Sequence, residues 1–229
     1  MKMYSILLLI FLSFNVRSEE APIKKSDNKW ALRGGLTLAY TTLNAEAATA
    51  DHTPSYGINT QFSYLFKKVE INLNAYILLG HASGLQYHID NINLFAEGDF
   101  RSFFFTPMIK YITDLELKKN WRLYLTLGAG WGIRSMKVLN FIDQGKEKNN
   151  HRINVSSRGL IGGLGFQEIS PIHSMGPLFV EILGAYFEAY QLTLVENLNF
   201  NQVSKRARED KYFHTFDGLL MINFGLTFL

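Results

Sequence analysis

Residues 218–229 read GLLMINFGLTFL, and their side chains alternate in character. One set is apolar: Leu220, Ile222, Phe224, Leu226 and Phe228. The other set is mixed: Met221, Asn223, Gly225 and Thr227. Because successive side chains of a β-strand point to opposite faces, this period of two predicts a strand with one apolar face. The fold depends on whether that face meets a protein core or lipid.

The composition of the chain is low in charge and rich in aromatic residues. Of 229 residues, 47% are hydrophobic, 19% are charged and 14% are aromatic, which is compatible with one large all-β domain. The formal net charge of +3 is too small to indicate nucleic-acid binding. The absence of cysteine excludes a disulfide framework and a thiolate metal site.

The first residues have the features of an export signal. MKMYSILLLIFLSFNVRS carries Lys2, an apolar run over residues 4–14, and the short side chains of Val16 and Ser18. The run is too short to span a bilayer, so we expect residues 1–18 to be a signal peptide, with an uncleaved anchor as the alternative. Residues 19–29 are then a polar leader, and residues 30–229 form the folded domain.

The alternation seen at the C-terminal stretch recurs along the chain. It predicts eight strands: residues 30–42, 56–66, 69–79, 103–112, 121–133, 155–169, 178–191 and 212–229. Short connections alternate with long ones, as in bacterial outer-membrane barrels whose termini lie on the short-turn, periplasmic side. The loop stretches LQYHIDNINLF and LTLVENLNF also alternate, so strand extensions, or an extra hairpin giving ten strands, stay open. Pro107 lacks an N–H donor, which predicts a bulge or an unpaired rim position.

The second face of the strands distinguishes lipid from core. It consists mostly of Gly, Ala, Ser, Thr, Asn and Gln, whereas a soluble barrel of the lipocalin kind would present Lys and Glu to water. Small polar side chains fit the narrow interior of an eight-stranded barrel, which leaves the apolar face for lipid. We therefore predict an all-β protein, an eight-stranded antiparallel up-and-down transmembrane β-barrel in the cell outer membrane.

Aromatic residues fall near the predicted strand ends, as expected for two girdles at headgroup depth. The short-turn girdle would contain Trp30, Phe66, Tyr111 and Trp121, and the long-loop girdle Tyr40, Tyr56, Phe103, Trp131 and Tyr212.

The chain resembles the small eight-stranded outer-membrane proteins of the OmpX and opacity type. The resemblance rests on the segments RGGLTLAY, LGAGWGI, LIGGLGF, FFFTPMIKYI and GLLMINFGLTFL. It implies insertion by the barrel assembly machinery, which would recognise the last strand as its signal, and a monomeric barrel. The implied signal residues are Phe224, Gly225, Leu226, Phe228 and Leu229.

Charged residues on the small-residue face gather near the short-turn ends. They are Arg33, Glu70, Lys110, Arg122 and Glu181. Buried ions are costly unless they are paired, so we predict a salt-bridge network that plugs the lumen, with a gate for a narrow pore as the alternative.

These patterns favour a structural or surface-interacting barrel, with a small pore as the alternative. A further alternative is a lipid A-modifying enzyme, similar to some barrels of this size, using His81 and Ser83 with Glu188 as the orienting carboxylate. A His and a Ser two residues apart in a loop are weak evidence, so we assign no catalytic residue, and we assign no cofactor-binding residue. We assign no metal-binding residue either, because the spacing of His81, His88 and Asp90 matches no ligand motif.

The expected partners are outer-membrane lipid and, through basic loop residues 134–152 and 204–211, the phosphates of lipopolysaccharide or an acidic protein. Ordinary solubilising charge is the alternative explanation for those loops.

Overall fold

The computed structural model describes residues 29–44, 50–89, 92–118, 120–143, 146–148, 151–169, 176–196, 206–208 and 216–228. The secondary structure of these residues consists of strands: β1 (Trp30–Asn44), β2 (Ala50–Phe66), β3 (Val69–Ile89), β4 (Ile92–Lys118), β5 (Trp121–Asp143), β6 (Lys146–Lys148), β7 (His151–Glu168), β8 (Leu178–Glu196), β9 (Arg206–Arg208) and β10 (Phe216–Phe228). No helix in these ranges is long and apolar enough to cross a membrane.

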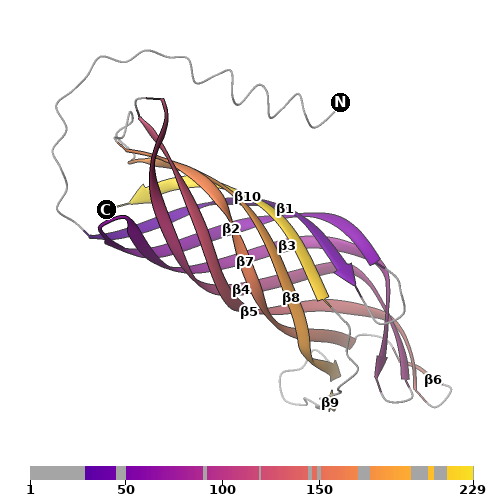
Figure 1. Cartoon of the computed structure of the whole chain (residues 1–229). Helices are drawn as coiled ribbons and strands as arrows, with labels where there is room; N and C mark the ends of the chain where they lie inside the picture. The colour runs from indigo at the N-terminus through magenta and orange to yellow at the C-terminus, as the bar shows by residue number, and fades with distance from the viewer. Residues whose placement is uncertain are drawn as a thin grey trace, which may run out of the picture.

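Eight of the strands close into a barrel (Figure 1). Each pairs antiparallel with its neighbours in the order β1-β2-β3-β4-β5-β7-β8-β10, and β10 also pairs with β1. The three-residue strands β6 and β9 only extend β5 and β8 in the loops. The predicted eight-stranded antiparallel barrel is therefore confirmed, and neither additional strand enters the wall.

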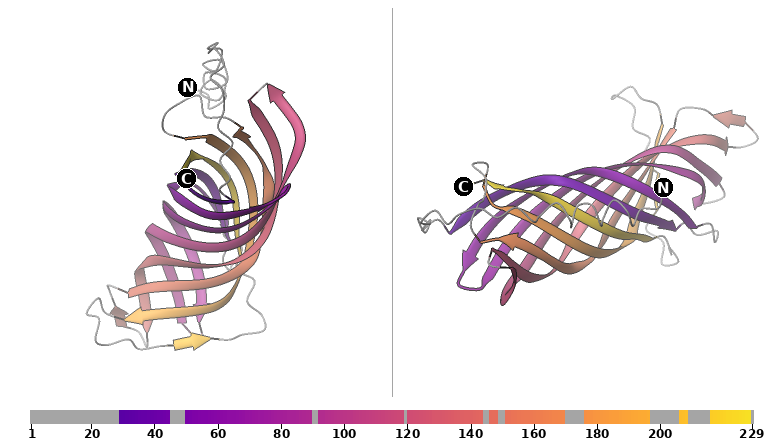
Figure 2. Two further views of the ribbon diagram at one scale, coloured as in Figure 1. Left: turned by 90° about the vertical axis from the view of Figure 1, so that its left-hand side faces the viewer. Right: turned by 90° about the horizontal axis from the view of Figure 1, so that it is seen from above.

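The two ends of the barrel differ in their connections. At the end where β10 finishes, Lys67 and Lys68 form a turn in which Lys67 has a φ of 58°, and the β4–β5 hairpin projects past its neighbours (Figures 1 and 2). We call this the turn end. The opposite end, which carries β6 and β9, is called the loop end.

Most strands continue further toward the loop end than their predicted bounds, and the strand extensions considered for LQYHIDNINLF and LTLVENLNF are present on β3, β4 and β8. Within residues 80–101, expected to be a loop, β3 runs on to Ile89 and β4 already begins at Ile92. We call these loop-end extensions the upper part of the barrel and the rest of the wall, toward the turn end, the lower part. In the upper part the apolar residues change sides: Leu85 and Phe100 are buried inside and His81 is exposed outside. Because the outer face is polar there, the upper strands lack the apolar stripe by which the lower parts were recognised.

Pro107 occupies the middle of β4, where the register shows no shift. It pairs with Leu73 of β3, while the bridges to β5 are interrupted at Thr106 and Pro107 and resume at Met108. The expected bulge or rim position was wrong. The missing N–H of Pro107 is tolerated because the β4–β5 hydrogen-bond ladder is interrupted at this one place.

The lower barrel is apolar outside and polar inside. Large apolar side chains such as Leu36, Ile77, Ile109 and Leu127 are about half or more exposed on the outer surface, while Asn59, Asn72 and Thr106 are buried inside. In water this arrangement would leave a continuous apolar belt unsatisfied. It is the arrangement expected of a barrel surrounded by hydrocarbon.

Candidate functional site

Four charged side chains meet inside the barrel near the turn end. Arg33 Nη2 donates to Glu70 Oε2 at 2.9 Å, and Arg33 Nη1 donates to Glu70 Oε1 and, at 2.7 Å, to Ser63 Oγ. Lys110 Nζ lies 3.7 Å from Glu70 Oε1 and 3.5 Å from Glu181 Oε1. We call Arg33, Glu70, Lys110 and Glu181 the turn-end cluster. Its two cations and two anions balance.

Neutral groups complete the surroundings of the turn-end cluster. Glu181 accepts hydrogen bonds from Gln61 Nε2 at 3.0 Å, Asn223 Nδ2 at 3.1 Å and the Tyr124 hydroxyl at 2.8 Å. Lys110 Nζ also lies 3.9 Å from the centre of the Tyr124 ring. Ionised groups remain buried at acceptable cost when they are both paired and hydrogen-bonded, and Glu181 meets both conditions.

Arg122, the fifth residue of the predicted network, does not lie in the turn-end cluster. Its Nη2 donates to Glu116 Oε1 at 2.8 Å in the β4–β5 hairpin, where both side chains are partly exposed. An irregularity in β4 between Ile112 and Glu116 places Glu116 opposite Arg122. Arg122 thereby has a partner at the barrel mouth.

A second buried ion pair lies nearer the loop end. Arg134 Nη1 of β5 donates to Asp217 Oδ1 of β10, and both side chains are almost fully buried. We call them the loop-end pair. The sequence analysis missed it, because Arg134 was assigned to a loop and Asp217 was not singled out. The sequence did contain an indication of the pair: every second residue of β5, including Tyr124 and Gly132, faces the interior, and Arg134 is the next residue in this series.

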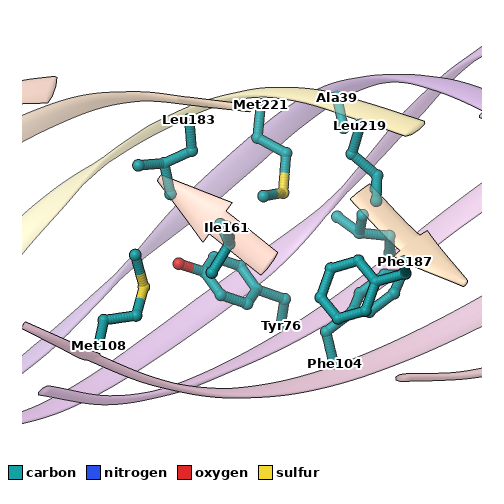
Figure 3. Close-up of a cluster of buried hydrophobic side chains, with 10 residues drawn as sticks. Ala39, Tyr76, Phe104, Met108, Ile161, Leu183, Phe187, Leu219 and Met221 are labelled. Atoms are coloured by element: carbon teal, nitrogen blue, oxygen red, sulfur yellow. The ribbon is translucent and has the colours of Figure 1, made fainter. Parts of the chain in front are cut away.

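An apolar cluster separates the two charged layers. Along β10, Leu219 and Met221 lie between Asp217 of the loop-end pair and Asn223, which contacts the turn-end cluster. Figure 3 shows these side chains meeting others from across the barrel. The cluster comprises Ala39, Tyr76, Leu78, Phe104, Met108, Ile161, Leu183, Phe187, Leu219 and Met221.

Glycines make room for the large interior side chains. A Cβ on Gly165 would lie 2.4 Å from the Tyr124 hydroxyl and 2.6 Å from the Val180 carbonyl oxygen. A Cβ on Gly132 would lie 2.5 Å from the Phe104 ring. The narrow interior is thus filled by pairing large side chains with residues that have none.

Most residues of the two predicted girdles lie on the outer surface. Trp30, Phe66, Tyr111, Tyr40, Tyr56, Phe103 and Trp131 are exposed, and Trp121 is partly buried. Tyr212 lies outside the described residues. The girdles stay a prediction, since their depth in a membrane is not given by exposure.

The residues of the predicted assembly signal lie on the strand that closes the barrel. Phe224, Leu226 and Phe228 of β10 pair with Leu36, Gly34 and Leu32 of β1. Gly225 lies opposite Gly35 of β1. Leu229 lies outside the described residues.

The side chains considered for catalysis lie on the outer wall and do not all come together. His81 Nδ1 of β3 is 3.0 Å from Asp99 Oδ1 of β4, and Ser83 is exposed two residues further along β3. Glu188 is exposed on β8, four strands away around the barrel in either direction. Glu188 therefore cannot orient His81.

Within the described ranges, no group of three or more His, Cys, Asp or Glu side chains could hold a metal ion. The side chains of His88 and Asp90 lie outside the described positions.

At the turn end, Lys68 Nζ lies 2.5 Å from Asp114 Oδ2 on the β4–β5 hairpin. The hydrogen bond and the opposite charge raise the pKa of Lys68 and lower the pKa of Asp114. Both groups are exposed, so we expect this contact to position the hairpin with little effect on overall stability.

The closed eight-stranded wall, the apolar outer face and the filled polar interior define the chain as a transmembrane β-barrel of the outer-membrane type. Neither a protein-family model nor a curated protein matches the chain. Solved outer-membrane barrels do match its fold.

The similar structures include Neisserial surface protein A, with 9% identity, a TM-score of 0.48, and coverage of 88% of this chain and 98% of that one. The attachment invasion locus protein Ail of Yersinia pestis, solved with the heparin analogue sucrose octasulfate, has 16% identity, a TM-score of 0.43, and coverage of 88% and 100%. The outer membrane protein OprG of Pseudomonas aeruginosa has 17% identity, a TM-score of 0.42, and coverage of 87% and 95%.

Proposed function

We propose that this protein is a closed, non-conducting barrel of the outer membrane whose role is structural or lies in surface interactions made by its loop end. In this proposal the loop end lies outside the cell and the turn end lies in the periplasm, which is the usual orientation of outer-membrane barrels.

The observation that carries this proposal is the layered filling of the lumen. The turn-end cluster, the apolar cluster and the loop-end pair follow one another along the interior. A water-filled path would have to cross all three layers, so it would need to break buried ion pairs and also to separate Phe104 and Phe187, whose ring centroids are 4.8 Å apart. Both changes are unfavourable in a packed interior.

Planar-bilayer conductance of the refolded full chain tests this proposal. We expect no discrete openings under conditions in which a general porin conducts. That porin is the positive control. A second sample, in which Tyr76, Phe104 and Phe187 are all replaced by Ala, opens only the apolar cluster and should also stay silent, because both charged layers remain. Reproducible openings of the unmodified protein would contradict the closed scaffold and support the small pore.

One contact favours a second candidate function, hydrolysis of an acyl ester in outer-leaflet lipid. Asp99, rather than Glu188, is hydrogen-bonded to His81, and Ser83 lies on the same outward face of β3. A serine, a histidine and a carboxylate are the groups required for acyl transfer to a serine hydroxyl followed by hydrolysis.

A lipid A deacylation assay distinguishes the two candidates. If the protein is a hydrolase, it releases fatty acid from lipid A, Ser83→Ala and His81→Ala abolish the release, and Glu188→Gln retains it. Failure of the folded wild-type protein to release fatty acid would exclude this candidate.

A further inference from the structure

Basic side chains gather on the outer wall above the apolar belt. Arg101 of β4 lies opposite Ser135 of β5, which lies opposite Asn154 of β7. Lys137 of β5 lies two residues above Ser135 and opposite Arg152 of β7. Arg101, Lys137 and Arg152 are exposed, and Ser135 and Asn154 are partly exposed. We call these five residues the outer-wall patch.

Two like charges face one another in the outer-wall patch. Lys137 and Arg152 are direct cross-strand partners, so their Cβ atoms are expected to lie about 5 Å apart, an arrangement that destabilises an antiparallel pair. Among the described residues, no carboxylate lies within 4 Å of the charged nitrogens of Arg101, Lys137 or Arg152. The nearby Asp99 is hydrogen-bonded to His81 on the β3 side. An anion between the strands would relieve this repulsion.

The height of the outer-wall patch matches that of lipid headgroups. Phe103 and Ile133 are paired, exposed apolar residues, and Arg101 and Ser135 lie two residues nearer the loop end on the same strands. With a rise of about 3.3 Å per residue and a tilt of about 40°, Arg101 lies about 5 Å above this apolar edge and Lys137 about 10 Å above it. The polar layer of a bilayer leaflet is about 5 to 8 Å thick, so the long side chains of the patch reach it.

We propose that the outer-wall patch binds the phosphorylated sugar headgroup of an outer-leaflet glycolipid of the lipid A kind. This inference rests on the proposed function, which places the loop end in the outer leaflet. Arginine guanidinium groups bind phosphate through paired donors, and the Lys137 ammonium supplies a further positive charge. The Ser135 hydroxyl and the Asn154 amide can bond sugar hydroxyls between the charges. Three cations suit a headgroup that carries two phosphates better than one that carries a single phosphate.

The test measures binding of fluorescently labelled lipid A to the refolded full chain in a zwitterionic detergent. We expect the wild type to bind bisphosphorylated lipid A at least tenfold more tightly than lipid A without phosphates, with the preference shrinking as salt is added. Lys137→Gln with Arg152→Gln should weaken binding of the bisphosphorylated form at least tenfold. The matched control Lys67→Gln, which removes one exposed positive charge at the turn end, should stay within twofold of wild type.

A stability measurement separates a binding role from a structural one. In detergent without lipid A, Lys137→Gln removes a repulsion, so it should unfold at the same denaturant concentration as wild type or a higher one. A lower concentration would mean that Lys137 stabilises the wall itself, which contradicts the proposal. Equal binding of both lipids by wild type, or unchanged binding by the double variant, would also overturn it.

Heat-modifiable migration, in which the folded form runs faster than the boiled form, is the check on the proposed function. Loss of lipid A preference in a protein that still migrates in this way refutes the patch alone. A protein that lacks heat-modifiable migration refutes the barrel and therefore both proposals.

Discussion

Glu70 contacts two cations at once, Arg33 of β1 and Lys110 of β4. Its side chain is almost fully buried, and so are both partners. Such a residue holds three strands in register through a single carboxylate. The cluster also illustrates why a buried ion pair is weak evidence for stability but a strong constraint on sequence: losing one member leaves the others uncompensated.

We therefore expect Glu70→Gln to destabilise the barrel by about 3–5 kcal/mol, because it leaves Arg33 and Lys110 with one remaining carboxylate between them. The double variant Arg33→Met with Glu70→Met keeps the remaining Lys110–Glu181 pair neutral and should lose about 2 kcal/mol less. Urea unfolding from lipid vesicles measures both. Equal losses for the single and the double variant would show that the four charges do not act as a network.

Gly165 tests the packing of the lumen at a single position. Gly165→Val places methyl groups against Tyr124 and the β8 backbone, so we expect a loss of about 1–3 kcal/mol or failure to fold. Gly184→Ala is the matched control, since the nearest atom to its Cβ is 4.0 Å away. Folding yield in detergent is the measurement, and equal yields for the two variants would contradict a tightly filled interior.

At the scale of elements, the predictable part of the fold was the part in contact with lipid. The lower strands were found because residues such as Leu36 and Leu127 form an apolar stripe on one side only. The upper parts of the strands lay outside the predicted bounds, and only the alternation of LQYHIDNINLF and LTLVENLNF indicated them, because the inner and outer roles exchange there, with Met136 inside and Lys137 outside. A search for outward apolar residues cannot follow a strand past that exchange.

The candidate site shows the same limit. Four members of the turn-end cluster were predicted because they are rare charges on a small-residue face, within strands already recognised. Arg134 was missed because the predicted strand ended at residue 133, directly before Arg134, whereas β5 runs on to Asp143. The outer-wall patch could not be predicted, because it depends on which strands are neighbours and on the register between them. The alternation of side chains within one strand indicates neither the neighbours nor the register.

The β4–β5 hairpin offers a prediction with a pH dependence. The pKa of Asp114 is lowered, so its contact with Lys68 is present above the ordinary carboxyl pKa and is lost as the pH falls through the lowered value. The pKa of Lys68 is raised, so the contact is lost at the alkaline side only as the pH rises through that raised value. Between these limits the hairpin should stay attached to the β2–β3 turn.

We expect Lys68→Gln to raise the titration midpoint of Asp114 toward its ordinary value of 3.8, because the hydrogen bond and the nearby positive charge are both removed. NMR of the labelled Asp114 carboxyl carbon follows this midpoint. The control Lys67→Gln removes the neighbouring charge but not the hydrogen bond, so its effect should be smaller. An unchanged midpoint in Lys68→Gln would mean that the contact does not form in solution.

At the scale of the whole molecule, closure depends on the pairing of β10 with β1, the two strands furthest apart in the sequence. This seam leaves no unpaired strand edge in the wall, which is a requirement in hydrocarbon. It also joins the beginning of the domain to its end, so the barrel is complete only when its last strand is in place.

A disulfide tests this seam, because the chain has no cysteine of its own. Leu38 and Ile222 are direct partners across β1 and β10, and opposite residues of an antiparallel pair have Cα atoms about 4.5 or 5.5 Å apart, within disulfide range. Leu38→Cys with Ile222→Cys should cross-link on oxidation and migrate faster on a non-reducing gel. Leu38→Cys with Leu127→Cys, whose strands are four apart, should not. A failure of the first pair to cross-link in folded protein would indicate an open sheet.

Strands β3, β4 and β5 extend further at the loop end than β10 does, and this difference affects how another molecule can approach the barrel. The eleven residue steps of β4 from Phe103 back to Ile92 would rise about 28 Å beyond the apolar belt, nearly the thickness of a second hydrocarbon core. By contrast, β10 begins at Phe216, close above Leu220. Among the described strands, the loop-end rim of the barrel is therefore higher on the β4 side than on the β10 side. If the loop end faces outward, as proposed, a molecule approaching the described strands would meet β3, β4 and β5 before it reached β10, so the two sides of the barrel would not be equivalent.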